Sequence, residues 1–240
     1  MVRGMRVTGA LLVVAGVAAL AWAFVVWRWE DPFTALYTSY EQHKLSSSYE
    51  HRLASFHPRI DRRTEEVTAE RHLISIEARL YRRSVHAGEA LGRIIVPRLG
   101  LKAILVTGTD HDSLIKGPGW YMRSRLPGEG QLIYIAGHRT TYLAPFAHID
   151  ALRPGDKVTI ELPYGTFVYE IRGHKIVTAD DLSRLQSHNQ EVLALQACHP
   201  RFFATHRYIA YAVPIRVIPR KALGPAYPVP LERLPPGTTA

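Results

Sequence analysis

The pattern of hydrophobic and polar positions divides the chain into four stretches, of which the first is strongly apolar. Val7 to Trp27, VTGALLVVAGVAALAWAFVVW, is an uncharged run of 21 residues. As a helix rising about 1.5 Å per residue it would extend roughly 31 Å, close to the thickness of the hydrocarbon core of a bilayer. Arg28 and Trp29 continue it as an interfacial belt. The pattern predicts a cytoplasmic arm and transmembrane anchor over residues 1–29.

A cleaved signal peptide is the alternative for this run, but the apolar part of such a peptide is usually only about 7–15 residues long. We therefore expect a retained, single-pass anchor in the cell membrane. Arg3 and Arg6 precede the run, and Glu30 and Asp31 follow it. Because positive charge marks the cytoplasmic side, the N-terminus is predicted to be cytoplasmic and the rest of the chain extracellular.

Residues 30–90 form the second stretch, which is rich in Arg, Glu, His and Ser and includes the run KLSSS. Its apolar residues are spaced as on helices, among them Val67, Leu73, Ile74, Ile76 and Leu80. We interpret this stretch as a partly helical stalk that holds the following domain away from the membrane.

The third stretch, residues 91–217, consists of short β-type runs separated by Gly and Pro signals. The runs are RIIVPRLGL, KAILVTG, GQLIYIAGH, DKVTIELPYGTFVYEIRGHKIV, EVLALQAC and HRYIAYAVPIRV, with a hairpin turn at LPYG. Two loops, DHDSLIKG and APFAHIDAL, are short helix candidates. So many short strands predict a mainly antiparallel barrel or sandwich. The fourth stretch, residues 218–240, holds six prolines in 23 residues and is predicted to be an extended or disordered tail.

The composition excludes a wholly disordered chain, because 47% of the residues are hydrophobic. The net charge of +9 is compatible with nucleic acid. However, the sequence has no zinc finger, RNP-like motif or Gly-rich phosphate loop, so we expect no nucleic-acid partner. A solvated basic face, or contact with anionic lipid or wall polymer, explains the charge more simply.

The run LALQACHP contains Cys198, the only cysteine, so an intramolecular disulfide is excluded. A buried free thiol is one interpretation, because free cysteine is among the most buried residue types. The strand-like run ends on this residue, however, which places the thiol at the edge of a sheet. A nucleophilic thiol needs such partial exposure together with a positive neighbourhood.

Several basic residues could supply that neighbourhood. His206 and Arg207 open the following predicted strand, which returns beside Cys198 if the two strands form an antiparallel hairpin, so one of the two should face the thiol. His199 is adjacent in sequence but should point to the opposite face of the strand. His138 ends another predicted strand and is a candidate acid or base.

Taken together, these motifs resemble the sortases, the membrane-anchored cysteine transpeptidases of Gram-positive bacteria. The resemblance covers about residues 91–217 and rests on AGHRTTYLAPF, LRPGD before a strand, LALQACHP and HRYIAYAVP, in the family's order. It implies a closed eight-stranded sortase-type β-barrel with short helices, preceded by the transmembrane helix and the stalk.

The resemblance also implies roles for three residues: Cys198 as the nucleophile, His138 as the general acid or base, and Arg207 as the group that holds substrate and stabilises the oxyanion. The implied partners are secreted proteins with a C-terminal LPxTG-type signal, cut between Thr and Gly through a thioester. An amino group of a lipid II-type peptidoglycan precursor is the implied acceptor. No cofactor is expected. The sequence has no acidic residues at the spacing of a calcium site, so no metal site is predicted.

Within the family, CHP after the cysteine and HRTTY after the histidine most resemble class E, the housekeeping class whose signal is of LAxTG type. That resemblance implicates Tyr142 in signal recognition. The alternative is that Tyr142 is an aromatic residue of the loop that only packs on the barrel. Thr141 and Ala197 are the other candidate substrate-binding residues. The family pattern before the cysteine is Thr-Leu-x-Thr-Cys, whereas Ala194 and Ala197 stand here in place of the threonines. Since losing an oxyanion donor can cost about 10²–10³ in rate, weakened activity or an altered signal is predicted.

Two functions from other classes stay open. One is a non-catalytic or weakly active anchored barrel that binds wall or protein partners, and the other is a plain cysteine peptidase. A pilus-polymerising sortase is a further alternative, because Asp31-Pro32-Phe33 matches a tripeptide found in the lids of such enzymes. Its position directly against the anchor, followed by a stalk, favours a juxtamembrane turn instead.

Overall fold

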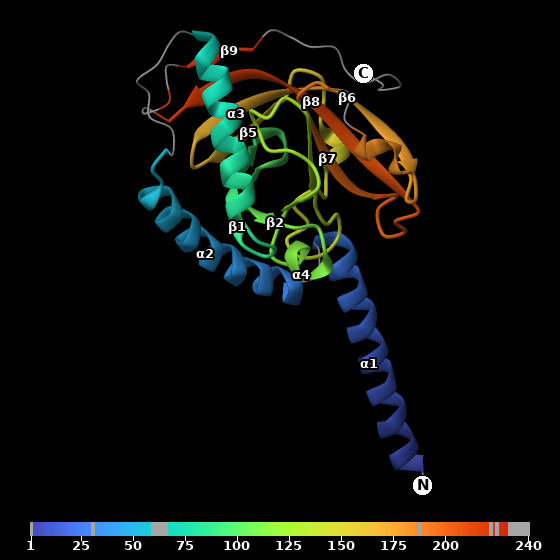
Figure 1. Cartoon of the computed structure of the whole chain (residues 1–240). Coiled ribbons are helices and arrows are strands. Elements are labelled where there is room, and N and C mark those ends of the chain that lie inside the picture. Colours follow the sequence, from blue (N-terminus) through green and yellow to red (C-terminus); the bar gives the residue numbers. More distant parts are fainter. Residues whose placement is uncertain are drawn as a thin grey trace.

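Eight strands close into a β-barrel in the computed structural model of the chain, which describes residues 2–29, 32–58, 67–186, 189–220, 223 and 226–229 (Figure 1). The barrel strands are β1 (Ala90–Val96), β2 (Leu101–Thr107), β3 (Gly119–Trp120), β4 (Leu132–Ala136), β5 (Lys157–Leu162), β6 (Gly165–Thr178), β7 (Val192–His199) and β8 (His206–Pro219). Around the barrel they follow the order β6-β5-β1-β2-β3-β4-β7-β8, and pairing of β8 with β6 closes the ring. The predicted closed barrel is confirmed.

Most neighbouring strands run antiparallel, but β2 pairs with β3, and β4 with β7, in parallel. The second of these pairs positions the candidate site. Ala136 on β4 lies opposite Gln196 on β7. The segments that follow these two residues therefore leave the barrel at the same edge, and they carry His138 and Cys198.

Alternation of side chains along each strand fills the barrel. On β4 and β7, Ile133, Ile135, Leu193 and Leu195 point inward and are buried in the main core. The intervening residues point outward and, with Val177 of β6, form a second apolar cluster on the outer face of β4, β6, β7 and β8, made of Leu132, Tyr134, Val177, Val192, Ala194, Ile209 and Tyr211. This outer cluster lies on the barrel face that carries the ends of β7 and β8.

The short helices lie in the connections between strands. α4 (His111–Leu114) falls within the predicted helix DHDSLIKG, and the Asp110 side chain caps it by accepting a hydrogen bond of 3.0 Å from the Ser113 amide. The second predicted helix is only one 3₁₀ turn, η2 (Ile149–Ala151). Two further 3₁₀ turns are η1 (Pro97–Leu99) and η3 (Leu182–Leu185). η1 interrupts the predicted run RIIVPRLGL, since Pro97 has no amide to donate.

The N-terminal apolar run forms one long helix, α1 (Val2–Trp29). Its segment Arg6–Val25 is long and apolar enough to cross a membrane and is not buried against the rest of the chain. In Figure 1 it projects away from the barrel. The helix therefore fits a single-pass membrane anchor.

Residues 30–90 differ from the stalk expected from the sequence. Their described part does contain helices, α2 (Pro32–Ser55) and α3 (Val67–Ser84), but both lie against the barrel (Figure 1). Tyr49 of α2 and Ile74 of α3 are almost fully buried, and the Tyr81 hydroxyl donates a hydrogen bond of 2.6 Å to the Leu91 carbonyl. These helices are part of the folded domain and do not act as a spacer.

Polar side chains fix α2 to the barrel. Gln42 is bonded to both backbone groups of Ile104 on β2: its Oε1 accepts from the amide at 2.7 Å and its Nε2 donates to the carbonyl at 3.0 Å. The side-chain amide of Gln42 thus makes the two hydrogen bonds that a neighbouring strand would otherwise make to Ile104. The Thr38 hydroxyl adds a bond of 2.7 Å to the Ile115 carbonyl. α2 is thereby held in one register along the barrel.

Most of the Pro-rich tail lies outside the described residues. Within the described part, β9 (Tyr227–Pro228) pairs with β8 and extends the sheet beyond the barrel. The Val229 amide also donates to the Ile215 carbonyl at 3.0 Å. This short piece of the tail is extended, and it is attached to the domain.

Candidate active site

Cys198 and Arg207 face each other across the β7–β8 hairpin. In the antiparallel register their Cα atoms are direct partners, and His199 is paired with His206. Directly opposite residues project from the same face of a sheet, so the thiol and the guanidinium share a face at the strand ends. Of the two basic residues expected to return beside the thiol, Arg207 is the one that does.

The face of β7 that carries Cys198 is the outer one. Ala197, the preceding residue, is fully buried in the barrel core, and side chains alternate along the strand. The prediction that Ala197 binds substrate is therefore wrong for its side chain, which points into the barrel. Ala194, the other alanine in place of a family threonine, lies in the outer cluster on the same face as Cys198.

Gln196 was not identified from the sequence, although it lies on this outer face between Ala194 and Cys198. The Tyr134 hydroxyl on β4 donates a hydrogen bond of 3.0 Å to its side-chain oxygen. This bond fixes the amide across the two strands, beside the thiol. The period of two along LALQAC is the signal that could have identified it.

His138 lies beside the end of β7 because β4 continues its parallel pairing by one residue. The Gly137 amide donates to the Gln196 carbonyl at 3.0 Å. A Cβ atom at Gly137 would come within 2.7 Å of the Phe146 ring, so a glycine is needed where this loop crosses the barrel edge. The structure thus brings His138, Cys198 and Arg207 to one edge of the barrel.

The His138 imidazole lies in a partly desolvated position. Its Nε2 atom is buried and has no hydrogen-bond partner among the described residues. Burial lowers the pKa of His138 below its usual value, and the nearby His111 ring lowers it further. The lowered pKa favours the neutral form of the ring near pH 7, and a neutral imidazole can accept a proton.

This lowered pKa predicts a pH-dependent stability difference. The unfolded chain protonates His138 at about pH 6.5 and the folded chain only at lower pH, so stability is lost as the pH falls from about 7 through the folded pKa. Relative to His138→Gln, the wild-type chain is expected to lose unfolding free energy between pH 8 and pH 5.5. Urea denaturation of both chains at the two pH values measures this; an unchanged difference would contradict it.

The loop after His138 has an unusual backbone. Tyr142, Leu143 and Ala144 have positive φ angles of 55°, 59° and 34°, which non-glycine residues rarely adopt. The Tyr142 ring lies 5.0 Å from the His138 ring between centroids, and its amide donates a bond of 3.0 Å to the Thr34 hydroxyl of α2. Thr141, also in this loop, is half-buried, and its carbonyl accepts from the Ala144 amide at 2.9 Å.

Arg139, the residue after His138, contacts the end of β7 and the 3₁₀ turn η2. It is only 5% exposed. Its guanidinium forms an ion pair of 2.7 Å with Asp150 and donates to the Cys198 carbonyl at 3.3 Å and to His199 Nδ1 at 3.0 Å. Because an arginine can only donate, His199 accepts with Nδ1. Burial lowers the pKa of His199, and the Arg139 charge lowers it further.

We expect Arg139→Met to destabilise the chain by about 1–3 kcal/mol, since it leaves buried carbonyl groups without a donor. The matched control is Arg98→Met, because Arg98 is 52% exposed and paired at 3.0 Å with Asp156. An arginine this exposed is screened by water, so its loss should cost the chain less stability than the loss of Arg139. Urea denaturation of the full chain in detergent compares the two variants. Equal losses would show that the Arg139 contacts carry no extra stability.

Arg207 is anchored by its own hairpin loop. Its Nη1 donates to the Ala204 carbonyl at 2.7 Å and to the His206 carbonyl at 3.0 Å. Both bonds leave from one nitrogen, so the guanidinium plane is held at the loop. The same loop carries two exposed aromatic residues, Phe202 and Phe203. A fixed cation opposite a half-buried thiol is the arrangement in which a thiolate and a developing oxyanion are stabilised.

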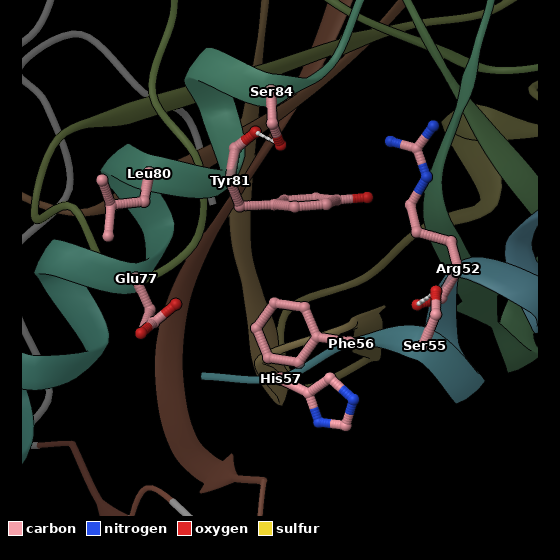
Figure 2. A pocket seen from close by; sticks show the side chains of 8 residues that line it. All are labelled: Arg52, Ser55, Phe56, His57, Glu77, Leu80, Tyr81 and Ser84. Carbon is pink, nitrogen blue, oxygen red and sulfur yellow. Dashed lines mark hydrogen bonds between the residues drawn. The ribbon is translucent and has the colours of Figure 1, made fainter. Parts of the chain in front are cut away.

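A cavity of about 350 Å³ lies elsewhere, between α2 and α3 (Figure 2). It is lined by Arg52, Ser55, Phe56, His57, Glu77, Leu80, Tyr81 and Ser84. None of these belongs to the strand ends described above, and Arg52 is already paired with Glu89 at 2.9 Å. Among the described residues, no group of three or more His, Cys, Asp or Glu side chains is placed to hold a metal ion.

Comparison with known proteins identifies sortases as relatives of this chain. Sortase D of Bacillus subtilis (strain 168) is 39% identical to this chain over 128 residues, which are 52% of this chain and 63% of that protein. The chain thus spans less than two thirds of the length of this curated relative.

Solved structures share the fold. A Clostridium perfringens sortase D5 transpeptidase matches with a TM-score of 0.57 and 20% identity, over 73% of this chain and 98% of that one. Sortase E1 from Streptomyces coelicolor, solved with a tripeptide in its active site, matches with a TM-score of 0.52 and 22% identity, over 59% of this chain and 98% of that one. The sortase domain family model matches residues 94–215, the barrel that carries Cys198, His138 and Arg207. The chain therefore belongs to the sortase family.

Proposed function

We propose that the chain is a cysteine transpeptidase that cleaves the C-terminal sorting signal of secreted proteins and joins them to an amino group of the cell-wall precursor. The signal is of LAxTG or LPxTG type and is cut between Thr and Gly. The observation that carries the proposal is the grouping of Cys198, Arg207 and His138 at the adjoining ends of β7, β8 and β4.

In the first half-reaction, neutral His138 accepts the proton of the Cys198 thiol, and the thiolate attacks the carbonyl carbon of the Thr–Gly amide. A C–S bond forms, and the guanidinium of Arg207 donates to the negative oxygen. The C–N bond then breaks as His138 returns its proton to the departing glycine amine. The products are a thioester on Cys198 and the released C-terminal fragment.

In the second half-reaction, the amine of the wall precursor attacks the thioester carbon. A new C–N bond forms, the C–S bond breaks, and His138 takes the surplus proton from the attacking nitrogen. Arg207 again faces the negative oxygen. The amide product leaves, and the proton on His138 returns to the thiolate, which restores the starting state.

Class E and a preference for LAxTG are part of the proposal. Tyr142 packs beside His138 and Thr141 lies in the same loop, so both are near the reacting groups. Gln196 and Ala194 lie on the outer face of β7 that leads to Cys198, and we assign to Gln196 the contact first expected of Ala197. The matched relatives include a class D and a class E sortase. Parallel assays with LAxTG and LPxTG peptides decide the preference.

The test uses the full chain in detergent with a fluorogenic signal peptide, with and without an amine acceptor. We expect cleavage between Thr and Gly, a trapped acyl adduct on Cys198, and a product joined to the amine; Cys198→Ala should give none of these. Product released to water however much amine is added would favour a plain cysteine peptidase. No cleavage and no adduct would favour a non-catalytic barrel that binds wall or protein partners.

The proposed topology has a cytoplasmic N-terminus and an extracellular barrel. Cys198 is the only thiol in the chain, so it reports on one side of the membrane. A membrane-impermeant thiol reagent should label it on intact cells stripped of their wall. Labelling only after lysis would reverse the orientation.

A further inference from the structure

The first half of α2 exposes a stripe of apolar and aromatic side chains. Phe33, Leu36, Tyr37 and Tyr40 are 71%, 71%, 43% and 68% exposed. Their spacing of i, i+3, i+4 and i+7 places all four on one face of the helix. On a soluble protein, a group of adjacent exposed apolar side chains of this kind marks a surface that contacts another protein or a membrane.

The other face of this part of α2 is bound to the barrel. Thr34, Thr38 and Gln42 make the hydrogen bonds to the Tyr142 loop, to Ile115 and to β2 described above. The helix is therefore fixed in rotation, and the stripe cannot turn inward onto the barrel. Tyr and Phe at the boundary of an apolar phase are typical of a membrane–water interface.

The stripe is continuous with the membrane span. α1 and α2 are separated in sequence only by residues 30 and 31. The ring of Trp22, in the last part of the Arg6–Val25 span, lies 5.5 Å from the ring of Phe33 between centroids. Phe33 is thus level with the last turn of the span. Figure 1 shows α2 starting beside α1, at the end of the barrel from which α1 projects.

Three contacts lead from that level to the candidate site. Trp22 packs on Phe33, the next residue Thr34 accepts from the Tyr142 amide at 3.0 Å, and the Tyr142 ring lies 5.0 Å from the His138 ring. Every step is a direct contact between neighbouring groups. The loop that flanks His138 is therefore close to the end of the span.

We propose that the stripe Phe33, Leu36, Tyr37 and Tyr40 is a bilayer-contacting surface, and that α2 holds the mouth of the site at the membrane surface. The partner is the headgroup and upper acyl region of the lipid. If the chain has the proposed function, this arrangement brings the thioester to an acceptor amine carried on a lipid. Only this consequence rests on the proposed function. The barrel is then seated on the membrane.

The test is spin labelling of the full chain in nanodiscs that contain one chain each. In a Cys198→Ala background, single cysteines replace Leu36 or Tyr40, with Ser48→Cys as the control on an exposed turn further along α2. Relaxation by oxygen, which concentrates in lipid, is compared with relaxation by a water-soluble nickel complex. We expect oxygen to dominate at 36 and 40 and nickel to dominate at 48.

A second pair of labels tests the position of the mouth. Leu143→Cys is next to Tyr142, and Leu143 is 41% exposed. His72→Cys, at an exposed position near the start of α3, is the control, because α3 starts at the end of the domain opposite α1 in Figure 1. Nickel-chelating lipid headgroups should relax the label at 143 and leave the label at 72 unaffected. Equal, weak relaxation at both positions would place the mouth away from the bilayer.

Three results would overturn the contact with lipid. Nickel-dominated relaxation at 36 and 40 would mean that the stripe faces water. Protection from both reagents would mean that protein covers it, and protection only in discs with two chains would identify a second copy as the partner. None of these readings depends on catalysis, so failure of the transpeptidase assay leaves the test intact.

Discussion

Replacing His138 with glutamine is expected to lower transpeptidation about 10²–10⁴-fold, the usual contribution of a positioned acid or base. Glutamine keeps a polar side chain of similar reach but cannot carry a proton from the thiol to the leaving amine. The Nε2 atom of His138 is buried and has no hydrogen-bond partner among the described residues. Steady-state cleavage of the signal peptide measures the loss.

The leaving group distinguishes a proton-transfer role from a merely structural one. If His138 protonates the departing amine, a thioester or activated ester analogue of the signal should lose much less rate in His138→Gln than the amide does, because its leaving group needs no proton. Equal losses with amide and ester would point to distortion of the site. Near-normal amide turnover in the variant would show that the acid is another residue.

Replacing Arg207 with alanine is expected to lower the rate about 10²–10³-fold, the loss found when a donor to an oxyanion is removed. Arg207 is the direct cross-strand partner of Cys198 and is held there by the carbonyls of Ala204 and His206. The loss should fall mainly on kcat, since negative charge on the substrate oxygen develops only in the transition state.

Arg207→Lys and Arg216→Ala are the matched variants for this test. Lysine keeps the charge but lacks the planar fork of donors, so it should restore only part of the rate. Arg216 is an exposed arginine further along the same strand, and its loss should leave the rate unchanged. A similar drop in both alanine variants would trace the effect to the net charge of β8.

Most of the barrel was predictable because its strands have a local signal; the exception is the two-residue β3 (Gly119–Trp120), which lies in none of the predicted runs. Val192 to His199 alternates between the core and the outer face, and the following strand returns at the spacing of a hairpin. Cys198 and His138 were identified because each ends such a strand. Ala197 was expected at the mouth because it directly precedes the cysteine, but side chains alternate along β7 and that of Ala197 points into the core.

The contacts made by α2 and by Arg139 were beyond the sequence for a physical reason. Both depend on side chains that bond to backbone atoms far away along the chain, such as Gln42 to Ile104 and Arg139 to the Cys198 carbonyl. Helical spacing indicates that a helix forms and says nothing about which surface it meets. The position of Asp31-Pro32-Phe33 favours a juxtamembrane turn, whereas Pro32 and Phe33 lie in the first turn of α2, which packs on the barrel; Asp31 lies outside the described residues.

The packing of α2 and α3 also sets where a shortened chain can begin and still fold. Cutting before Leu91 would strip Tyr49, Ile74 and Tyr81 from the core and leave the Ile104 backbone without its Gln42 partner. Cutting near Pro32 removes the anchor alone. Limited proteolysis of the whole chain should accordingly leave a resistant fragment that still carries α2, with hydrogen exchange at the Ile104 amide as slow as in the barrel strands.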